Sequence, residues 1–154
     1  SGFSNGAMFS EILACELPFI NSVASVSGVV ELGSGGSQGL KQCDNDVSKH
    51  NYRSSVLLIH GTNDSVVPWN GNSFLGFPSI PDDLDDWVHR NNCVGTSIST
   101  LNSGQFTNKL WKQCQDKSII ELVKHNGGHE WPINSNFNTT SYIMEYFMKQ
   151  KIDF

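Results

Sequence analysis

Three short runs of apolar residues along the chain predict buried strands. They cover residues 22–30, which are rich in valine, residues 55–60, which read SVLLIH, and residues 118–125, which read SIIELVKH. Runs of this length and composition are typical of parallel strands that are covered on both faces. One or two further edge strands are expected around Phe106 and Trp111, in an otherwise polar stretch.

Elsewhere, apolar residues recur at helical spacing. The spacing predicts helices over residues 7–16 and 141–151, and the second of these carries lysine in its final turn. A third helix is predicted over residues 79–91 from its start pattern, with Pro81 in the first turn and aspartates at the N-terminal end. Residues 31–52 are rich in Gly, Ser, Asn and Lys, so we expect a loop there. The resulting order is helix, strand, strand, helix, strand, helix. This order predicts an α/β fold with helices on the faces of a parallel sheet.

The composition is that of a folded acidic protein, and it excludes some classes of binding partner. Hydrophobic residues make up 38% of the 154 positions and charged residues 16%, as in globular domains. The formal net charge of −5 provides no basic surface for nucleic acid or for an anionic membrane. No apolar run approaches the roughly 20 residues that span a bilayer. We therefore expect neither nucleic acid nor a membrane as a partner, and the oligomeric state stays open.

Four cysteines, Cys15, Cys43, Cys93 and Cys114, favour disulfide bonds over a metal site. They contain no CxxC pair, and zinc sites usually need closely spaced ligands. Two disulfides in an oxidising compartment are predicted, with four buried thiols as the alternative. Three connectivities are possible, of which Cys15–Cys43 and Cys93–Cys114 close the shorter loops. The aspartates at 82–86 lack the spacing of a calcium loop, so we predict no metal and assign them to the start of a helix.

Residues 2–6 read GFSNG and match the G-x-S-x-G nucleophile elbow. An elbow holds its serine on a tight strand-to-helix turn, where the hydroxyl group is accessible. We expect a side chain at either flanking glycine, Gly2 or Gly6, to collide with the turn or the neighbouring strand. Ser4 is therefore the candidate nucleophile, and the N–H of Asn5 is the candidate oxyanion donor. A chance match to this short pattern is the alternative.

Two further motifs come directly after predicted strands. Asp64 ends the segment HGTND, and His129 lies on the glycine-rich segment GGHEWP, from which it is free to reach other loops. Taken singly, Asp64 is equally well explained as a turn cap, and a surface histidine is the alternative interpretation of His129. Together with Ser4, they follow the chain order Ser, Asp, His, which is that of α/β-hydrolases and not of chymotrypsin or subtilisin. The three residues therefore predict a catalytic triad.

The segments GFSNGAM, HGTNDSVVPW and GGHEWP closely resemble motifs of the polyhydroxybutyrate depolymerase and feruloyl esterase group of secreted α/β-hydrolases. The resemblance runs over essentially the whole chain. It implies a secreted, cofactor-free serine esterase with Ser4 as nucleophile, Asp64 as acid and His129 as general base. Tryptophans ahead of Cys93 and Cys114 are also similar to the pattern of this group, which supports the pairing of these two cysteines.

In that group, several strands and the loop with the second oxyanion donor precede the elbow, whereas three residues precede Ser4 here. The resemblance therefore implies that residues 1–154 are the C-terminal part of an α/β-hydrolase catalytic domain, with its N-terminal strands missing. We expect such a chain on its own to be poorly stable and weakly active, since one edge of its sheet lacks a partner.

The substrate is the least defined part of this interpretation. Phe3, Trp69 and Trp131 adjoin the three motifs and are candidates for an apolar acyl pocket, with a plain core role as the alternative. An ester substrate, polymeric in some members of the group, is expected: hydroxyalkanoate polymer, feruloylated sugar and acetylated glycan all fit. A peptidase or thioesterase of the same fold and a non-catalytic remnant are the competing functions.

Two segments match the acceptor sequence for N-linked glycosylation. They are Asn138-Thr-Thr140 and Asn63-Asp-Ser65, and the second falls on the predicted active-site turn.

Overall fold

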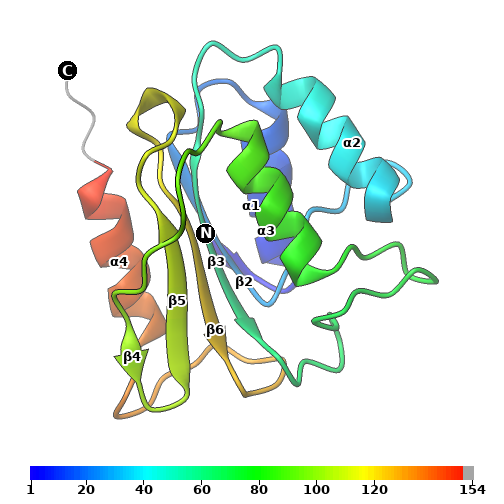
Figure 1. Ribbon diagram of the computed structural model, residues 1–154. Coiled ribbons are helices and arrows are strands. Elements are labelled where there is room, and N and C mark those ends of the chain that lie inside the picture. Colours follow the sequence, from blue (N-terminus) through cyan, green and yellow to red (C-terminus); the bar gives the residue numbers. More distant parts are fainter. Residues whose placement is uncertain (151–154) are drawn as a thin grey trace.

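The fold is built on one mixed sheet with helices on both faces, and the computed structural model describes it for residues 1–150 (Figure 1). The sheet has six strands in the order β1-β2-β3-β6-β5-β4. The first four strands in this order are parallel, whereas β5 and β4 are antiparallel to their neighbours. The strands are β1 (Gly2–Phe3), β2 (Ser22–Val26), β3 (Ser55–Gly61), β4 (Asn102–Ser103), β5 (Phe106–Trp111) and β6 (Ile120–His125).

The predicted α/β fold is confirmed, but the prediction of a wholly parallel sheet is wrong at β5. Residues 107–111 of β5 pair antiparallel with residues 120–124 of β6. Because the connection at residues 112–119 is short, it has no room for the crossover helix that a parallel pair requires. The edge strands expected near Phe106 and Trp111 are therefore a single strand, with β4 beside it.

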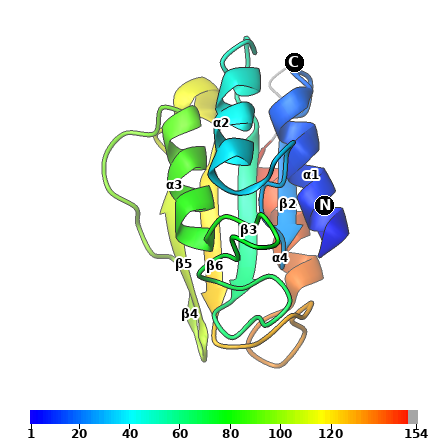
Figure 2. The same ribbon diagram turned by 90° about the vertical axis from the view of Figure 1, so that its right-hand side faces the viewer.

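Helices α1, α2 and α3 cover one face of the sheet and α4 covers the other (Figures 1 and 2). The three predicted helices are present as α1, α3 and α4. The predicted final residue of the last helix, Lys151, lies outside the described residues. The bounds are α1 (Asn5–Glu16), α2 (Gly36–Val47), α3 (Ile80–Arg90) and α4 (Thr139–Lys149).

Helix α2 lies in the segment that was expected to be a loop, so this prediction is wrong. Three of its buried side chains, Leu40, Cys43 and Val47, recur at intervals of three and four residues and face the core. The other positions are mostly polar or glycine, which hides this narrow apolar stripe in the composition. The disulfide from Cys43 to Cys15 then ties α2 to α1.

The first buried run also ends earlier than predicted, because strand β2 stops at Val26. Ser27 takes a positive φ of 54° and donates its N–H to the carbonyl of Ile59. Val29 and Val30 remain fully buried, but they pack in the core from a loop. Burial of the apolar run was therefore predicted correctly and its conformation was not.

Strand β3 shows why its run of apolar residues is continuous. It lies between β2 and β6, and every one of its residues is buried. Val56 and Leu58 face helices α1–α3, whereas Leu57 and Ile59 face α4. A strand covered on both faces has no solvent-exposed position for an alternating polar side chain.

The four cysteines form the two disulfides Cys15–Cys43 and Cys93–Cys114, so the favoured pairing is confirmed and the free-thiol alternative is wrong. Disulfides persist in oxidising surroundings, and two of them indicate such a setting for this protein. Separately, none of the helices among residues 1–150 is long and apolar enough to cross a membrane.

Candidate active site

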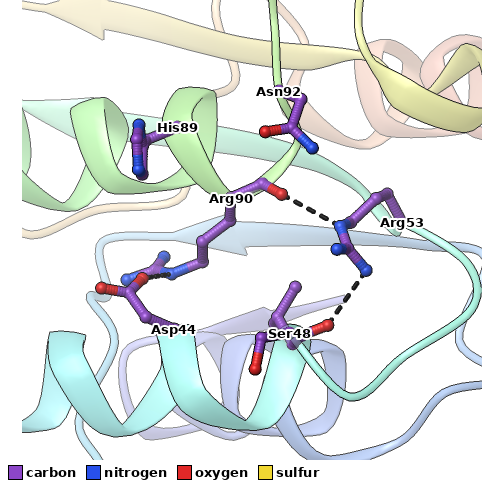
Figure 3. Close-up of a pocket in the computed structure, with 7 residues that line it drawn as sticks. Asp44, Ser48, Arg53, His89, Arg90 and Asn92 are labelled. Atoms are coloured by element: carbon purple, nitrogen blue, oxygen red, sulfur yellow. Dashed lines mark hydrogen bonds and ion pairs between the residues drawn. The ribbon is translucent and has the colours of Figure 1, made fainter.

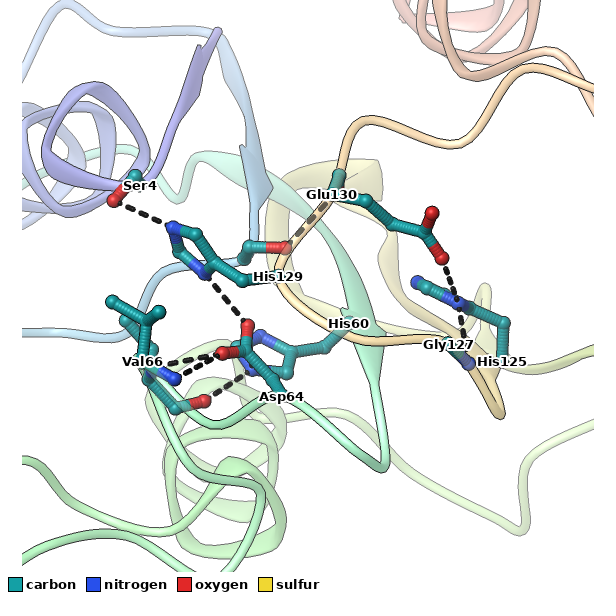
Figure 4. Close-up of polar contacts among 10 residues, drawn as sticks. Ser4, His60, Asp64, Val66, His125, Gly127, His129 and Glu130 are labelled. Carbon is teal, nitrogen blue, oxygen red and sulfur yellow. Dashed lines mark hydrogen bonds and ion pairs between the residues drawn. The ribbon is translucent and has the colours of Figure 1, made fainter.

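The three residues of the predicted triad meet at the carboxyl ends of the parallel strands. Ser4 follows β1, Asp64 lies three residues after β3, and His129 lies four residues after β6. Figure 4 shows their side chains pointing toward one another from these three segments. Ligand sites of α/β sheets lie at this edge, since loops from neighbouring parallel strands emerge there together.

Ser4 lies on a strained turn between β1 and α1. Its φ of 55° and ψ of −119° fall outside the regions that residues other than glycine usually adopt. The turn is held from both sides: the Ser4 N–H donates to the carbonyl of Val26, and the Ser4 carbonyl accepts from Ala7 and Met8. Asn5 is the first residue of α1, so the helix leaves its N–H unpaired at the site.

The two glycines of the elbow differ in how much space surrounds them. A Cβ on Gly2 would overlap the backbone carbonyl of Gly6, which confirms the predicted collision at that position. A Cβ on Gly6 would meet no atom within 4 Å, so the same prediction is wrong for Gly6. Gly2, on the strand side of the elbow, therefore has no room for a side chain, whereas Gly6, on the helix side, does.

Gly2→Ala is expected to lower the free energy of unfolding by about 3 kcal/mol, because overlap with backbone atoms has no flexible side chain to relieve it. Gly6→Ala is the matched control. It is expected to be neutral or to stabilise α1 by up to about 1 kcal/mol, since alanine is the better helix former. Urea unfolding followed by circular dichroism measures both values, and equal losses from the two substitutions would contradict this assignment.

His129 joins the other two members of the triad through its two ring nitrogens. Nδ1 lies 2.9 Å from Oδ2 of Asp64, and Nε2 lies 3.0 Å from Oγ of Ser4. A carboxylate only accepts hydrogen bonds, so Nδ1 carries the proton and Nε2 is left to accept from the Ser4 hydroxyl. In this tautomer the imidazole is set to take a proton from serine.

Asp64 is held by three hydrogen-bond donors in a site without water access. Its side chain is 0% exposed, and Oδ1 accepts the N–H groups of Val66 and Val67, each at 2.8 Å. Oδ2 faces His129, with Nε2 of His60 at 3.4 Å. These bonds fix the carboxylate in place.

His60 is a residue of this site that the sequence analysis did not single out. It lies on β3, is 2% exposed, and donates Nε2–H to the carbonyl of Val67 at 2.8 Å. Burial lowers its pKa below the usual value, which keeps the ring neutral. His60 therefore braces the turn that carries Asp64. The available signal was a polar residue at the end of an otherwise apolar strand.

The loop that carries His129 is tightly attached to its surroundings. The carbonyl of Gly127 accepts the N–H of Asn63, and Ser27 donates its hydroxyl to the carbonyl of Glu130. His125 is buried, accepts the Gly127 N–H at Nδ1, and lies 3.6 Å from the carboxylate of Glu130. Burial lowers the pKa of His125. The glycine-rich loop is thus held in one position and not left free.

The three aromatic candidates for substrate contact lie in different surroundings. Phe3 is 38% exposed, and its ring centroid is 4.8 Å from that of His129. Trp69 lies behind His60, with the ring centroids 6.2 Å apart, and borders a cavity of about 320 Å³ between α3 and strands β5 and β6. Trp131 donates its indole N–H to Thr140 and packs against the core beneath α4. Their role in substrate binding stays a prediction.

Another cavity, of about 250 Å³, lies between α2, α3 and the residues just before β3 (Figure 3). Its two arginines are already engaged, because Arg90 bonds to Asp44 at 2.6 Å and Arg53 donates to the carbonyls of Arg90, Val47 and His50. Arg53 precedes β3, so this cavity lies at the amino ends of the strands, away from Ser4. We therefore assign Arg53 and Arg90 a structural role, and not a role in binding a ligand in this cavity.

No group of three or more His, Cys, Asp or Glu side chains within residues 1–150 is arranged to hold a metal ion. Comparison with known protein families found no matching family, and comparison with curated proteins found no significant match. The resemblance of the three motifs to one hydrolase group therefore stays a prediction, and the functional argument rests on the geometry of the site.

Proposed function

We propose that this chain is a serine hydrolase of the α/β-hydrolase type that cleaves carboxylic esters through an acyl-enzyme. One observation carries the proposal: the hydrogen-bonded chain from Ser4 through His129 to Asp64, with distances of 3.0 and 2.9 Å. The strained backbone of Ser4 supports it, because strain of this kind concentrates at functional sites. The choice of esters among acyl compounds rests on the resemblance of the motifs.

In the first step, Nε2 of His129 takes the hydroxyl proton of Ser4 as Oγ attacks the ester carbonyl carbon. The carbonyl oxygen becomes an oxyanion, which the N–H of Asn5 is placed to stabilise. The imidazolium then gives its proton to the departing alcohol, and the acyl group stays on Ser4. Throughout this step, the buried charge of Asp64 offsets the positive charge on His129.

In the second step, a water molecule gives its proton to the same imidazole and attacks the acyl carbon. Collapse of the new oxyanion breaks the bond to Ser4 Oγ, which takes the proton back from His129, and the carboxylic acid leaves. No cofactor enters this cycle. We further propose an extracellular setting, which the two disulfides support.

Labelling with a fluorophosphonate probe tests this proposal, because the probe reacts once with an activated serine and needs no rapid turnover. We expect covalent modification of Ser4 in the whole chain, identified by peptide mass spectrometry. Ser4→Ala should abolish labelling, whereas Ser65→Ala, at an exposed serine beside Asp64, should leave it unchanged. Folded wild-type chain that resists the probe would contradict an activated Ser4 and leave a non-catalytic remnant as the better interpretation.

The acyl group is tested separately on matched substrates. Nitrophenyl butyrate, the corresponding thioester and a nitroanilide present ester, thioester and amide bonds of similar size, and we expect hydrolysis of the first to be fastest. Preference for the thioester or the amide would support the competing functions. The weak activity expected of residues 1–154 alone stays a prediction, measured in the same assay.

A further inference from the structure

We propose that Asn138 is a site of N-linked glycosylation and that Asn63, in the second acceptor sequence, is not. Both asparagines are exposed, so exposure alone does not separate them. The difference lies in what their side-chain nitrogens already bind, because the glycan is attached to Nδ2. This inference does not depend on the proposed hydrolase activity.

Asn138 presents its acceptor sequence at the start of α4 in a form that a glycan would not disturb. Its backbone is extended, with φ −124° and ψ 105°, and its Oδ1 caps the helix by accepting the N–H of Ser141 at 3.0 Å. Within residues 1–150, Nδ2 of Asn138 donates no hydrogen bond, and the side chain is engaged only through Oδ1. Because a glycosylated asparagine keeps its carbonyl oxygen, the helix cap and the modification use different atoms of the same side chain.

The third residue of this acceptor sequence is also accessible. Thr140 is exposed, and its hydroxyl oxygen accepts a hydrogen bond from the indole N–H of Trp131. The middle residue, Thr139, is buried and donates to the carbonyl of Pro132, which anchors the segment to the protein. The segment therefore exposes the two residues that define the acceptor and buries the one between them.

Asn63 has the opposite arrangement. Its Nδ2 donates to the carbonyl of Asn126 at 2.5 Å, which ties the turn carrying Asp64 to the loop carrying His129. The middle residue of this sequence is Asp64 itself, with a fully buried side chain. A glycan on Asn63 would be attached to the same nitrogen that donates the hydrogen bond between the two loops of the candidate site.

The neighbourhood of Asn138 also fits a bulky polar group. Ile133 forms an isolated bridge with Asn138 and is 61% exposed. A glycan that starts from Asn138 would lie beside Ile133 and limit the contact of this apolar side chain with other molecules. The two disulfides indicate passage through an oxidising compartment, which in eukaryotic cells is also where N-glycans are added.

Secretion of the whole chain from a eukaryotic host, followed by peptide:N-glycosidase digestion and mass spectrometry, tests this proposal. We expect one glycan, removed with conversion of Asn138 to aspartate. Asn138→Asp should eliminate it while keeping the helix cap, since aspartate accepts the same bond. Thr140→Ala should also eliminate it, whereas Thr140→Ser and Asn63→Gln should retain it.

Secreted wild-type protein whose mass is unchanged by the glycosidase would overturn the proposal. So would a glycan that survives Asn138→Asp and disappears in Asn63→Gln. The thermal midpoint of each variant shows that it is folded, so that loss of the glycan is assigned to the acceptor sequence.

Discussion

Replacing Ser4 by alanine is expected to lower the rate of ester hydrolysis by up to about 10⁶-fold, because the attacking oxygen is removed. The side chain of Ser4 makes no hydrogen bond to the helix that follows it. The fold should therefore survive the substitution, and an unchanged thermal midpoint would verify this. Release of nitrophenol from a short-chain ester measures the rate.

Asp64→Asn is expected to lower the rate of ester hydrolysis about 10⁴-fold, since an amide in place of the carboxylate favours the wrong tautomer of His129. The double variant Ser4→Ala, Asp64→Asn should hydrolyse the ester no more slowly than Ser4→Ala alone, because the residues act as one unit. Asp85→Asn, at an exposed aspartate on α3, is the control for loss of one negative charge. If Asp64→Asn retained a tenth of the wild-type rate, the acid role of Asp64 would be wrong.

The sequence predicted well those features whose determinants are close together in the chain. Strand β3 is recognisable in the sequence as a short apolar run because all its residues are buried. Strand β6 is a similar run that is interrupted by Glu121 and by the exposed Lys124. Ser4, Asp64 and His129 were singled out because an elbow, a strand-end acid and a glycine-rich loop each follow an element in a fixed order. Three local patterns were sufficient to place three residues that the fold brings together.

The features that were missed depend on contacts between distant segments. Helix α2 has low apolar content, and its buried stripe is recognisable only once α1 is beside it. The direction of β5 follows from a short connection and from pairing with β6. The brace that His60 provides for Asp64 depends on a turn whose geometry no motif specifies.

Asp83 is the clearest case of a residue whose role was assigned by local pattern and differs in the structure. The sequence assigned the aspartates at 82–86 to the start of a helix, and Asp82 and Asp83 do lie in the first turn of α3. Asp83, however, is 0% exposed and points into the core. There its carboxyl group lies close to that of Glu11 from α1, which is also 0% exposed, and burial together with the nearby Glu11 carboxyl group raises the pKa of Asp83.

These two carboxyl groups are surrounded by donors. Glu11 accepts bonds from Ser25 at 2.5 Å and from the indole of Trp87 at 3.0 Å, and Asp83 accepts the N–H of Val30 at 3.2 Å. The remaining oxygen, Oδ1 of Asp83, has no donor from another residue. We expect a proton shared between the two acids to fill this position, and Arg90 supplies a nearby positive charge.

Burial is the main cause that raises the pKa of both carboxyl groups, and each unit of increase corresponds to about 1.4 kcal/mol. Below about pH 4, the folded and unfolded chains both hold these protons, so the pair carries no cost. As the pH rises, the unfolded chain releases its protons while the folded pair retains one. The free energy of unfolding therefore falls, until the folded pair itself titrates.

Asp83→Asn is expected to remove much of this fall in the free energy of unfolding at high pH. The new amide can donate its own hydrogen to Glu11 and still accept the N–H of Val30. The variant should be more stable than wild type at about pH 9, by roughly 1–3 kcal/mol, and the difference should shrink toward about pH 4. Urea unfolding across this pH range measures the difference, with Asp85→Asn as the control that should show no such trend. A difference that is the same at both ends of the range, or a variant that is less stable at high pH, would show that the two carboxyl groups hold no shared proton. In that case the unpaired oxygen of Asp83 would need another explanation, since a buried acceptor without a donor costs about 1–3 kcal/mol.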